Sequence, residues 1–130
     1  MAEESAALKA EVKSFWNRQS CDTQYADSEK FTRDYFEQIE KWRYSDQPFI
    51  HSFAQFTRYH GKQVLEVGFG AGTDFIQWLR AGALASGMDL TEEALANLRG
   101  VLLTTSGTMH LRNTAREFEF RNVLAGLAQA

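Results

Sequence analysis

The sequence predicts an α/β protein built around a parallel sheet, with a helical segment before it. Three observations support this. Residues 63–67 have strand composition and run directly into three closely spaced glycines. A helical pattern follows from residue 73, and a second strand-like run at 83–88 leads into another helical pattern. A strand–loop–helix–strand–helix order is typical of parallel sheets, because the helix returns the chain to the starting edge.

Composition narrows the class of protein. The chain has 130 residues, 44% hydrophobic and 24% charged, with a formal net charge of −3, which suits one domain. Basic residues are interspersed with acids, so we expect no nucleic-acid partner. The N-terminus has no secretory pattern and no stretch approaches the ~20 apolar residues of a membrane span, so we expect no membrane partner and a cytoplasmic location. The single cysteine, Cys21, cannot form an internal disulfide, and no Cys/His cluster has metal-ligand spacing.

Residues 1–60 form the expected helical N-terminal segment, which packs on the core. The first helix should carry an apolar stripe at helical spacing, made of Leu8, Val12, Phe15 and Trp16. Ser28 can cap a second helix, whose stripe is Phe31, Tyr35, Ile39 and Trp42. Pro48 ends or restarts that helix, and a third short helix is expected over residues 49–56. Such stripes are usually buried in a core.

Residues 61–100 form the expected strand–loop–helix–strand–helix unit, and residues 101–130 a divergent tail. Gly82 should end the helix that starts at Thr73. Thr91 can cap a helix over residues 92–99, which Gly100 should end. In the tail we expect a short strand at residues 101–103, a polar loop, and a helix from about residue 111.

The residues with chemical potential are an acid and three glycines at alternate positions, Glu66, Gly68, Gly70 and Gly72. Glycines after a strand let the backbone approach a ligand closely, because no Cβ intervenes. The next helix offers free N–H groups to an anionic group. Asp89 ends the second strand, where an acid can accept hydrogen bonds from both ribose hydroxyls. The pattern therefore predicts a nucleoside-containing ligand.

Two common nucleotide motifs fit poorly. A phosphate-binding P-loop requires Gly-Lys-Ser/Thr after its glycines, and this chain has Thr73-Asp74 there. A dinucleotide fingerprint requires glycine or alanine at the position of Thr73. The charge of Glu66 would also repel a pyrophosphate, whereas it suits a ligand that carries an ammonium group.

The stretch from Val64 to Thr91 resembles the first two motifs of class I S-adenosylmethionine-dependent methyltransferases. Residues 12–100 are similar to a bacterial methyltransferase-domain group with Phe-Trp-Asn in its N-terminal helix and Arg-Tyr before the loop. The resemblance implies a Rossmann-like sheet, S-adenosylmethionine as cofactor and a small-molecule methyl acceptor. It implies these cofactor-binding residues: Glu66 at the amino end; Gly68, Phe69, Gly70, Gly72 and Asp74 at the loop; Asp89, Leu90 and Thr91 at the adenosine; and Arg43 and Tyr44 as cover.

One residue departs from the family pattern. Many relatives have a small residue or cysteine where this chain has Phe69, and we expect this side chain to point outward from the loop or towards the cofactor. The family motifs indicate no general base here, so the catalytic residues stay unknown.

The resemblance ends near Gly100. Five further strands would require on the order of 100 residues, and only residues 90–130 follow Asp89. We therefore expect a partial Rossmann-like sheet, in a methyltransferase or a truncated remnant of one. The alternative is a non-catalytic α/β interaction module, or an obligate homodimer that pairs through an exposed sheet edge.

Overall fold

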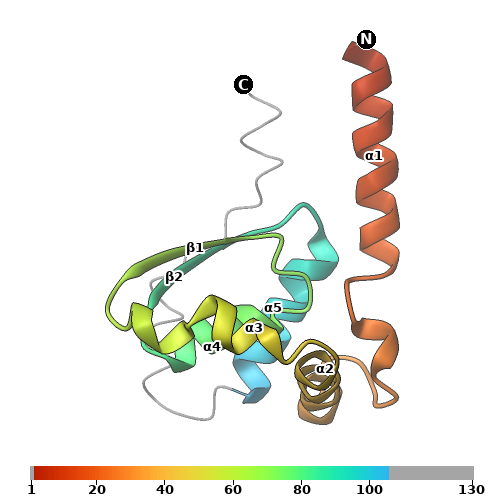
Figure 1. The fold of residues 1–130 in the computed structure, drawn as a ribbon. Coiled ribbons are helices and arrows are strands. Elements are labelled where there is room, and N and C mark those ends of the chain that lie inside the picture. Colours follow the sequence, from red (N-terminus) through yellow and green to blue (C-terminus); the bar gives the residue numbers. More distant parts are fainter. Residues whose placement is uncertain (1, 106–130) are drawn as a thin grey trace.

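The computed structural model describes residues 2–105, and this part of the chain is mixed α/β with five α-helices and a two-stranded sheet (Figure 1). The strands lie above α3, α4 and α5, and α1 extends away from the other elements (Figure 1). The elements in chain order are α1 (Ala2–Arg18), the 3-10 helix η1 (Thr23–Tyr25), α2 (Arg33–Asp46), α3 (Phe49–Ala54), η2 (Phe56–Tyr59), β1 (Gln63–Val67), α4 (Thr73–Arg80), β2 (Leu84–Met88) and α5 (Glu92–Thr105).

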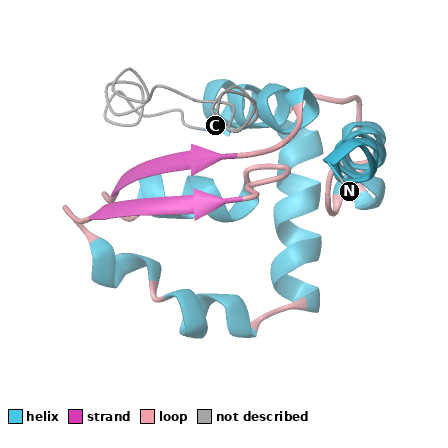
Figure 2. Ribbon diagram, turned by 90° about the horizontal axis from the view of Figure 1, so that it is seen from above, coloured by secondary structure: helices cyan, strands magenta, loops and turns pink. Residues whose placement is uncertain are grey.

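The predicted parallel sheet is confirmed. β1 and β2 pair in parallel, with Gln63 opposite Leu84 and Val67 opposite Met88. The Gly68 N–H donates to the Met88 carbonyl at 2.7 Å, which continues the pairing into the loop after β1. Both strands point towards α1 and α2 (Figure 2), so these two helices stand at the carboxyl ends of the strands.

The two faces of the sheet differ. Side chains alternate between the faces of a strand, and Ala85 of β2 is fully buried against the helices. The opposite face, which we call the open sheet face, is made of Leu65, Val67 and Leu84, and these side chains are 58%, 74% and 46% exposed. Within residues 2–105, helices therefore cover only one face of the sheet.

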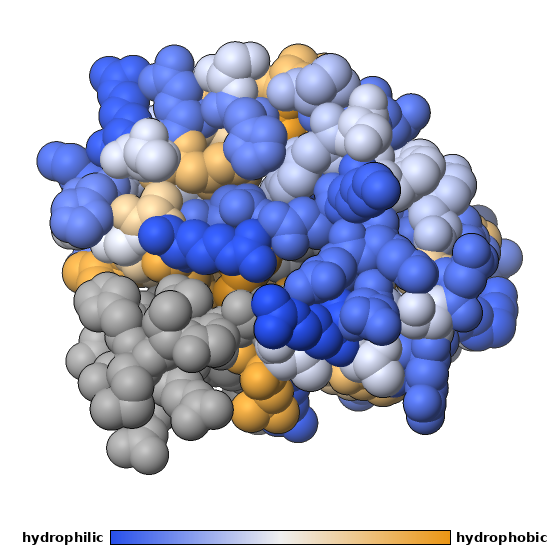
Figure 3. Space-filling model, turned by 90° about the horizontal axis from the view of Figure 1, so that it is seen from below, coloured by the Kyte–Doolittle hydropathy of each residue, from blue (hydrophilic) through white to orange (hydrophobic). Residues whose placement is uncertain are grey.

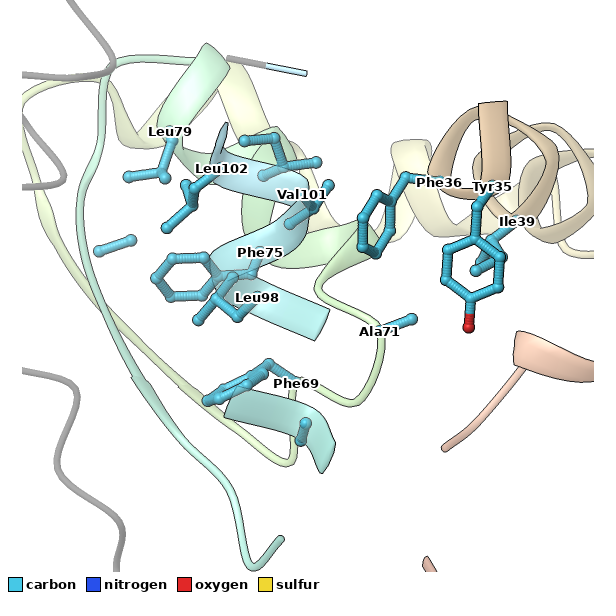
Figure 4. Close-up of a cluster of buried hydrophobic side chains, with 13 residues drawn as sticks. Tyr35, Phe36, Ile39, Phe69, Ala71, Phe75, Leu79, Leu98, Val101 and Leu102 are labelled. Atoms are coloured by element: carbon cyan, nitrogen blue, oxygen red, sulfur yellow. The ribbon is translucent and has the colours of Figure 1, made fainter. Parts of the chain in front are cut away.

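The hydrophobic core lies between α2, α4, α5 and the sheet (Figure 4). Burying one large apolar side chain, such as Leu, Ile or Phe, stabilises a fold by about 1.5–3 kcal/mol. The core contacts are therefore the main source of stability among the described elements. Seen from below, the outer surface is mostly hydrophilic with small hydrophobic patches (Figure 3). The principal core side chains are Tyr35, Phe36, Ile39, Phe69, Phe75, Ile76, Leu79, Leu98, Val101 and Leu102.

The expectation that the apolar stripe of α1 is buried was wrong. No residue of α1 is buried, because the helix projects from the fold and reaches α5 only near its own C-terminal end (Figure 1). The contact is polar. Lys13 forms a 2.7 Å ion pair with Glu92, and the Asn17 side chain accepts a hydrogen bond from the Glu93 N–H. Asn17 thus binds a backbone group at the start of α5 that has no partner within the helix.

α2 begins later than the sequence suggested. Its cap is Thr32, whose hydroxyl accepts a hydrogen bond from the Tyr35 N–H, so the prediction of Ser28 as the cap was wrong. The left-handed conformation of Phe31, with φ of 64°, interrupts the backbone between the two positions. Ser28 instead accepts a hydrogen bond from the Gln38 side chain. In the expected stripe of α2, Tyr35 and Ile39 are buried, whereas Phe31 is exposed.

The predicted end of α5 at Gly100 and the predicted strand at residues 101–103 were also wrong, because α5 continues to Thr105. A Cβ on Gly100 would lie 2.8 Å from the ring of Phe36. Gly100 therefore permits close packing of α5 on α2 and does not end the helix. By contrast, Gly82 follows α4 in the left-handed conformation and Thr91 caps α5, as predicted. The helix expected from about residue 111 lies outside the described residues.

Replacing Gly100 with alanine should destabilise the protein by about 1–3 kcal/mol, because the added methyl group overlaps Phe36. Chemical denaturation would measure the loss. Adding F36L should recover part of it, since the smaller side chain makes room. A loss that is the same in both backgrounds would contradict this packing role and would instead fit a glycine at a helix end.

Candidate functional site

A tight glycine loop, residues 68–72, connects β1 to α4. Gly68, Gly70 and Gly72 have φ values of 75°, 54° and 80°, a conformation that other residues adopt at a steric cost. Gly72 has a second constraint, because a Cβ there would lie 3.0 Å from Val101 and 3.1 Å from Leu98. Gly68 and Gly70 line the cavities described below, whereas Gly72 lies against α5.

Asp89, at the end of β2, holds this loop in place. Its Oδ2 accepts a hydrogen bond from the Gly70 N–H at 3.0 Å. Its Oδ1 accepts from the Thr91 N–H at 3.1 Å and from the Thr91 hydroxyl at 3.2 Å. A carboxylate has about four acceptor positions, so Asp89 keeps capacity for a ligand hydroxyl.

An apolar cleft of about 430 Å³ opens beside Asp89. Leu90 and Thr91 line it, as the sequence suggested, together with Gly68 and Gly70. Sequence reasoning missed the opposite wall, which consists of Val12 and Trp16 from α1, Ser20 and Cys21 from the following loop, and Val67 and Met88 from the strand ends. The apolar spacing in α1 was visible, but the pattern predicted burial in a core, whereas the cleft leaves these side chains accessible.

A smaller polar cavity of about 80 Å³ lies beside the same loop and shares Cys21, Gly68 and Gly70 with the apolar cleft. Arg43 of α2 lines this cavity and binds two of its acidic side chains. Its Nε and Nη2 donate to the two oxygens of Asp74 at 2.9 and 2.6 Å, and its Nη1 donates to Asp22 at 2.7 Å. The hydrogen bonds to Asp74 raise the pKa of Arg43 most strongly, against the effect of burial. This paired geometry is the strongest form of Arg–carboxylate contact.

Tyr44 binds the same carboxylate, that of Asp74. Its hydroxyl donates to Asp74 at 2.9 Å and lies 3.3 Å from the Thr73 carbonyl. Burial, followed by the charge of Asp74, raises the pKa of the Tyr44 phenol. Arg43 lines the polar cavity, whereas Tyr44 does not. The predicted position of Asp74 beside the loop is therefore found, and α2 is joined to the start of α4 through it. Asp22, which completes the network, gave no recognisable signal in the sequence.

Glu66 is the second acid of the polar cavity. Its Oε2 accepts a hydrogen bond from the Trp78 indole at 2.9 Å. Burial raises the pKa of Glu66 to about 7, and the nearby charge of Asp74 adds to this, against the Trp78 hydrogen bond and the charge of Arg43. Among the described residues the cavity has three acids, Asp22, Glu66 and Asp74, and only one cation, Arg43. The cavity therefore favours a positively charged group.

Phe69 does not point outward from the loop. Its side chain is buried in the core, with its ring centroid 6.0 Å from that of Phe75, and the residue also lines the polar cavity. Gly87 on β2 makes room for it, because a Cβ there would lie 2.9 Å from the Phe69 ring. The ring thus anchors the loop in the core (Figure 4).

Comparisons with protein-family models, curated proteins and solved structures find no match for this chain. Among residues 2–105, no group of three or more His, Cys, Asp or Glu side chains could hold a metal ion. Within the same range, no helix is long and apolar enough to cross a membrane. The function is therefore inferred from the two cavities and the residues around them.

Replacing Glu66 with glutamine should stabilise the protein at high pH. The pKa of Glu66 rises from 4.5 to about 7 on folding, so its ionised form destabilises the fold. The penalty is absent below about pH 4.5 and complete above about pH 7. We expect E66Q to exceed the wild type by about 1–3 kcal/mol at pH 8 and to show no such gain at pH 4.5. Urea denaturation at both pH values measures this, and an equal difference at both would contradict the assignment.

Proposed function

We propose that this chain binds S-adenosylmethionine as a class I methyltransferase does, with a partial Rossmann-like fold and a small-molecule methyl acceptor. One observation carries the proposal. The glycine loop separates an apolar cleft that contains an acid, Asp89, from a small cavity with net negative charge around Glu66. S-adenosylmethionine has a matching division, with an adenosine at one end and an ammonium and a sulfonium at the other.

The apolar cleft suits the adenosine half. Trp16 offers a flat aromatic surface to a purine, and Leu90 and Met88 offer apolar contact. Asp89 lies in the same cleft with acceptor capacity for a ribose hydroxyl. Thr91 keeps the carboxylate oriented through two hydrogen bonds.

The polar cavity suits the methionine half. Its net negative charge favours the ammonium and sulfonium groups and disfavours a pyrophosphate. A cation beside Glu66 would also stabilise the carboxylate form of that residue. The start of α4 adjoins the cavity at Thr73 and Asp74, and the positive end of the helix dipole there suits the carboxylate of the ligand.

The mechanism assigned to the chain's residues is binding and orientation. When bound, the cofactor supplies an electrophilic methyl group. Arg43 and Tyr44 fix Asp74, and Asp89 fixes Gly70, so hydrogen bonds within the chain position the loop that would hold the sulfonium end. Preorganised placement of two reactants can supply a large part of the acceleration of a displacement reaction.

The open sheet face supports a second function, partner binding. Leu65, Val67 and Leu84 are exposed there, and both strands have an unpaired edge within the described residues. Such edges pair readily with another chain. A homodimer through this sheet would be seen by light scattering, and L84K should then shift it to the monomer. A wild-type monomer at high concentration would argue against this second function.

Titration calorimetry with S-adenosylhomocysteine tests the first function. We expect binding by the wild-type chain and weakening of about 1–3 kcal/mol in W16A, because the aromatic side chain on which the base would stack is lost. F15A is the matched control. Phe15 is the neighbouring aromatic residue, similarly exposed, and it does not line the cleft. No heat with the wild type at millimolar ligand, or equal losses in W16A and F15A, would contradict the assignment of the cleft.

A further inference from the structure

We propose that a third cavity, between α3 and β1, binds an organic amine with an aromatic or apolar body. This α3 cavity has a volume of about 410 Å³. Its walls come from four elements, with Phe53 on α3, Phe56 on η2, Leu65 on β1 and Trp78 on α4. Sequence reasoning assigned no function to these aromatic residues beyond a place in the core.

The walls of the α3 cavity suit an apolar body. Phe56 is buried, and its ring meets that of Trp78 edge-on with the centroids 4.5 Å apart. Phe53 is 86% exposed, so it stands at the rim and makes little contact with the rest of the fold. Aromatic faces attract cations as well as apolar groups, which favours a ligand that combines the two.

The charged side chains that line the α3 cavity determine which polar group its ligand can carry. Its lining includes two acids, Glu66 and Asp74, and no lysine, arginine or histidine among the described residues. Arg43 already pairs with Asp74. Glu66 gives one oxygen to Trp78, and its Oε1 accepts no hydrogen bond from residues 2–105. An ammonium group can donate to that oxygen, whereas a carboxylate or phosphate would be repelled.

The place of the α3 cavity connects it to the proposed function, on which the next step rests. It shares Glu66, Gly68 and Asp74 with the polar cavity, so an amine held at Oε1 of Glu66 adjoins the proposed position of the sulfonium. The ammonium of the cofactor would then use acceptor positions that remain on the carboxylates of the polar cavity. The amine would then be the methyl acceptor. In that transfer the ammonium first loses a proton to water. The nitrogen lone pair forms the new N–C bond, and the electron pair of the broken C–S bond stays on sulfur.

The test uses the full chain and three probes of similar size, 2-phenylethylamine, 2-phenylethanol and phenylacetate. Two-dimensional NMR at pH 8 would follow the Trp78 indole and the α3 amides, with and without S-adenosylhomocysteine. We expect the amine to bind at least tenfold more tightly than the alcohol, equivalent to about 1.4 kcal/mol, and phenylacetate not to bind. E66Q should abolish the preference for the amine.

F53S should weaken amine binding about threefold or more, because the rim of the cavity is lost. F49S is the matched control, since Phe49 is an exposed phenylalanine of the same helix and does not line the cavity. Equal affinity for amine and alcohol, or equal effects of F53S and F49S, would overturn the proposal. Amine binding without any S-adenosylhomocysteine binding would support the amine site and refute the proposed function. The reverse result would retain the function and refute the site.

Discussion

The contact of Asp89 with the glycine loop is the constraint on which the candidate site depends. This carboxylate joins three separate parts of the chain, since it ends β2, binds the Gly70 N–H and fixes Thr91 at the start of α5. Without it, Gly70 would have no partner to hold its left-handed conformation beside the strand end. The shapes of the apolar cleft and the polar cavity both follow from that fixed loop.

A second network, of ion pairs, holds the chain in place on the other side of the glycine loop. Arg43 bridges Asp22 and Asp74, so the segment after α1 and the start of α4 are both joined to α2. Glu66 lies beyond this network, and within residues 2–105 only Trp78 donates a hydrogen bond to it. Asp22 and Asp74 therefore share one fixed cation, whereas Glu66 can receive a charged ligand.

The sheet and its loop were predictable because local rules determine them. The strand composition, the alternate glycines and the threonine cap are read within a few residues of each other. Long-range packing determined the rest. The stripe of α1 has the pattern of a core helix, yet nothing in the sequence shows that only its last turns meet α5. The local sequence predicts a helix end at Gly100. The structure instead places Phe36, which is far away in sequence, against this glycine. Phe69 and Asp22 likewise acquire their roles only through partners on other elements.

The most direct test of the account is an NMR titration of the full chain with S-adenosylhomocysteine. The ligand should shift the amides of Gly68, Gly70 and Asp89 together with the Trp16 indole, because these groups border the two cavities that meet at the loop. Gly82, at the far end of α4, should not move. Unchanged signals at the loop, or shifts confined to residues away from both cavities, would contradict the account.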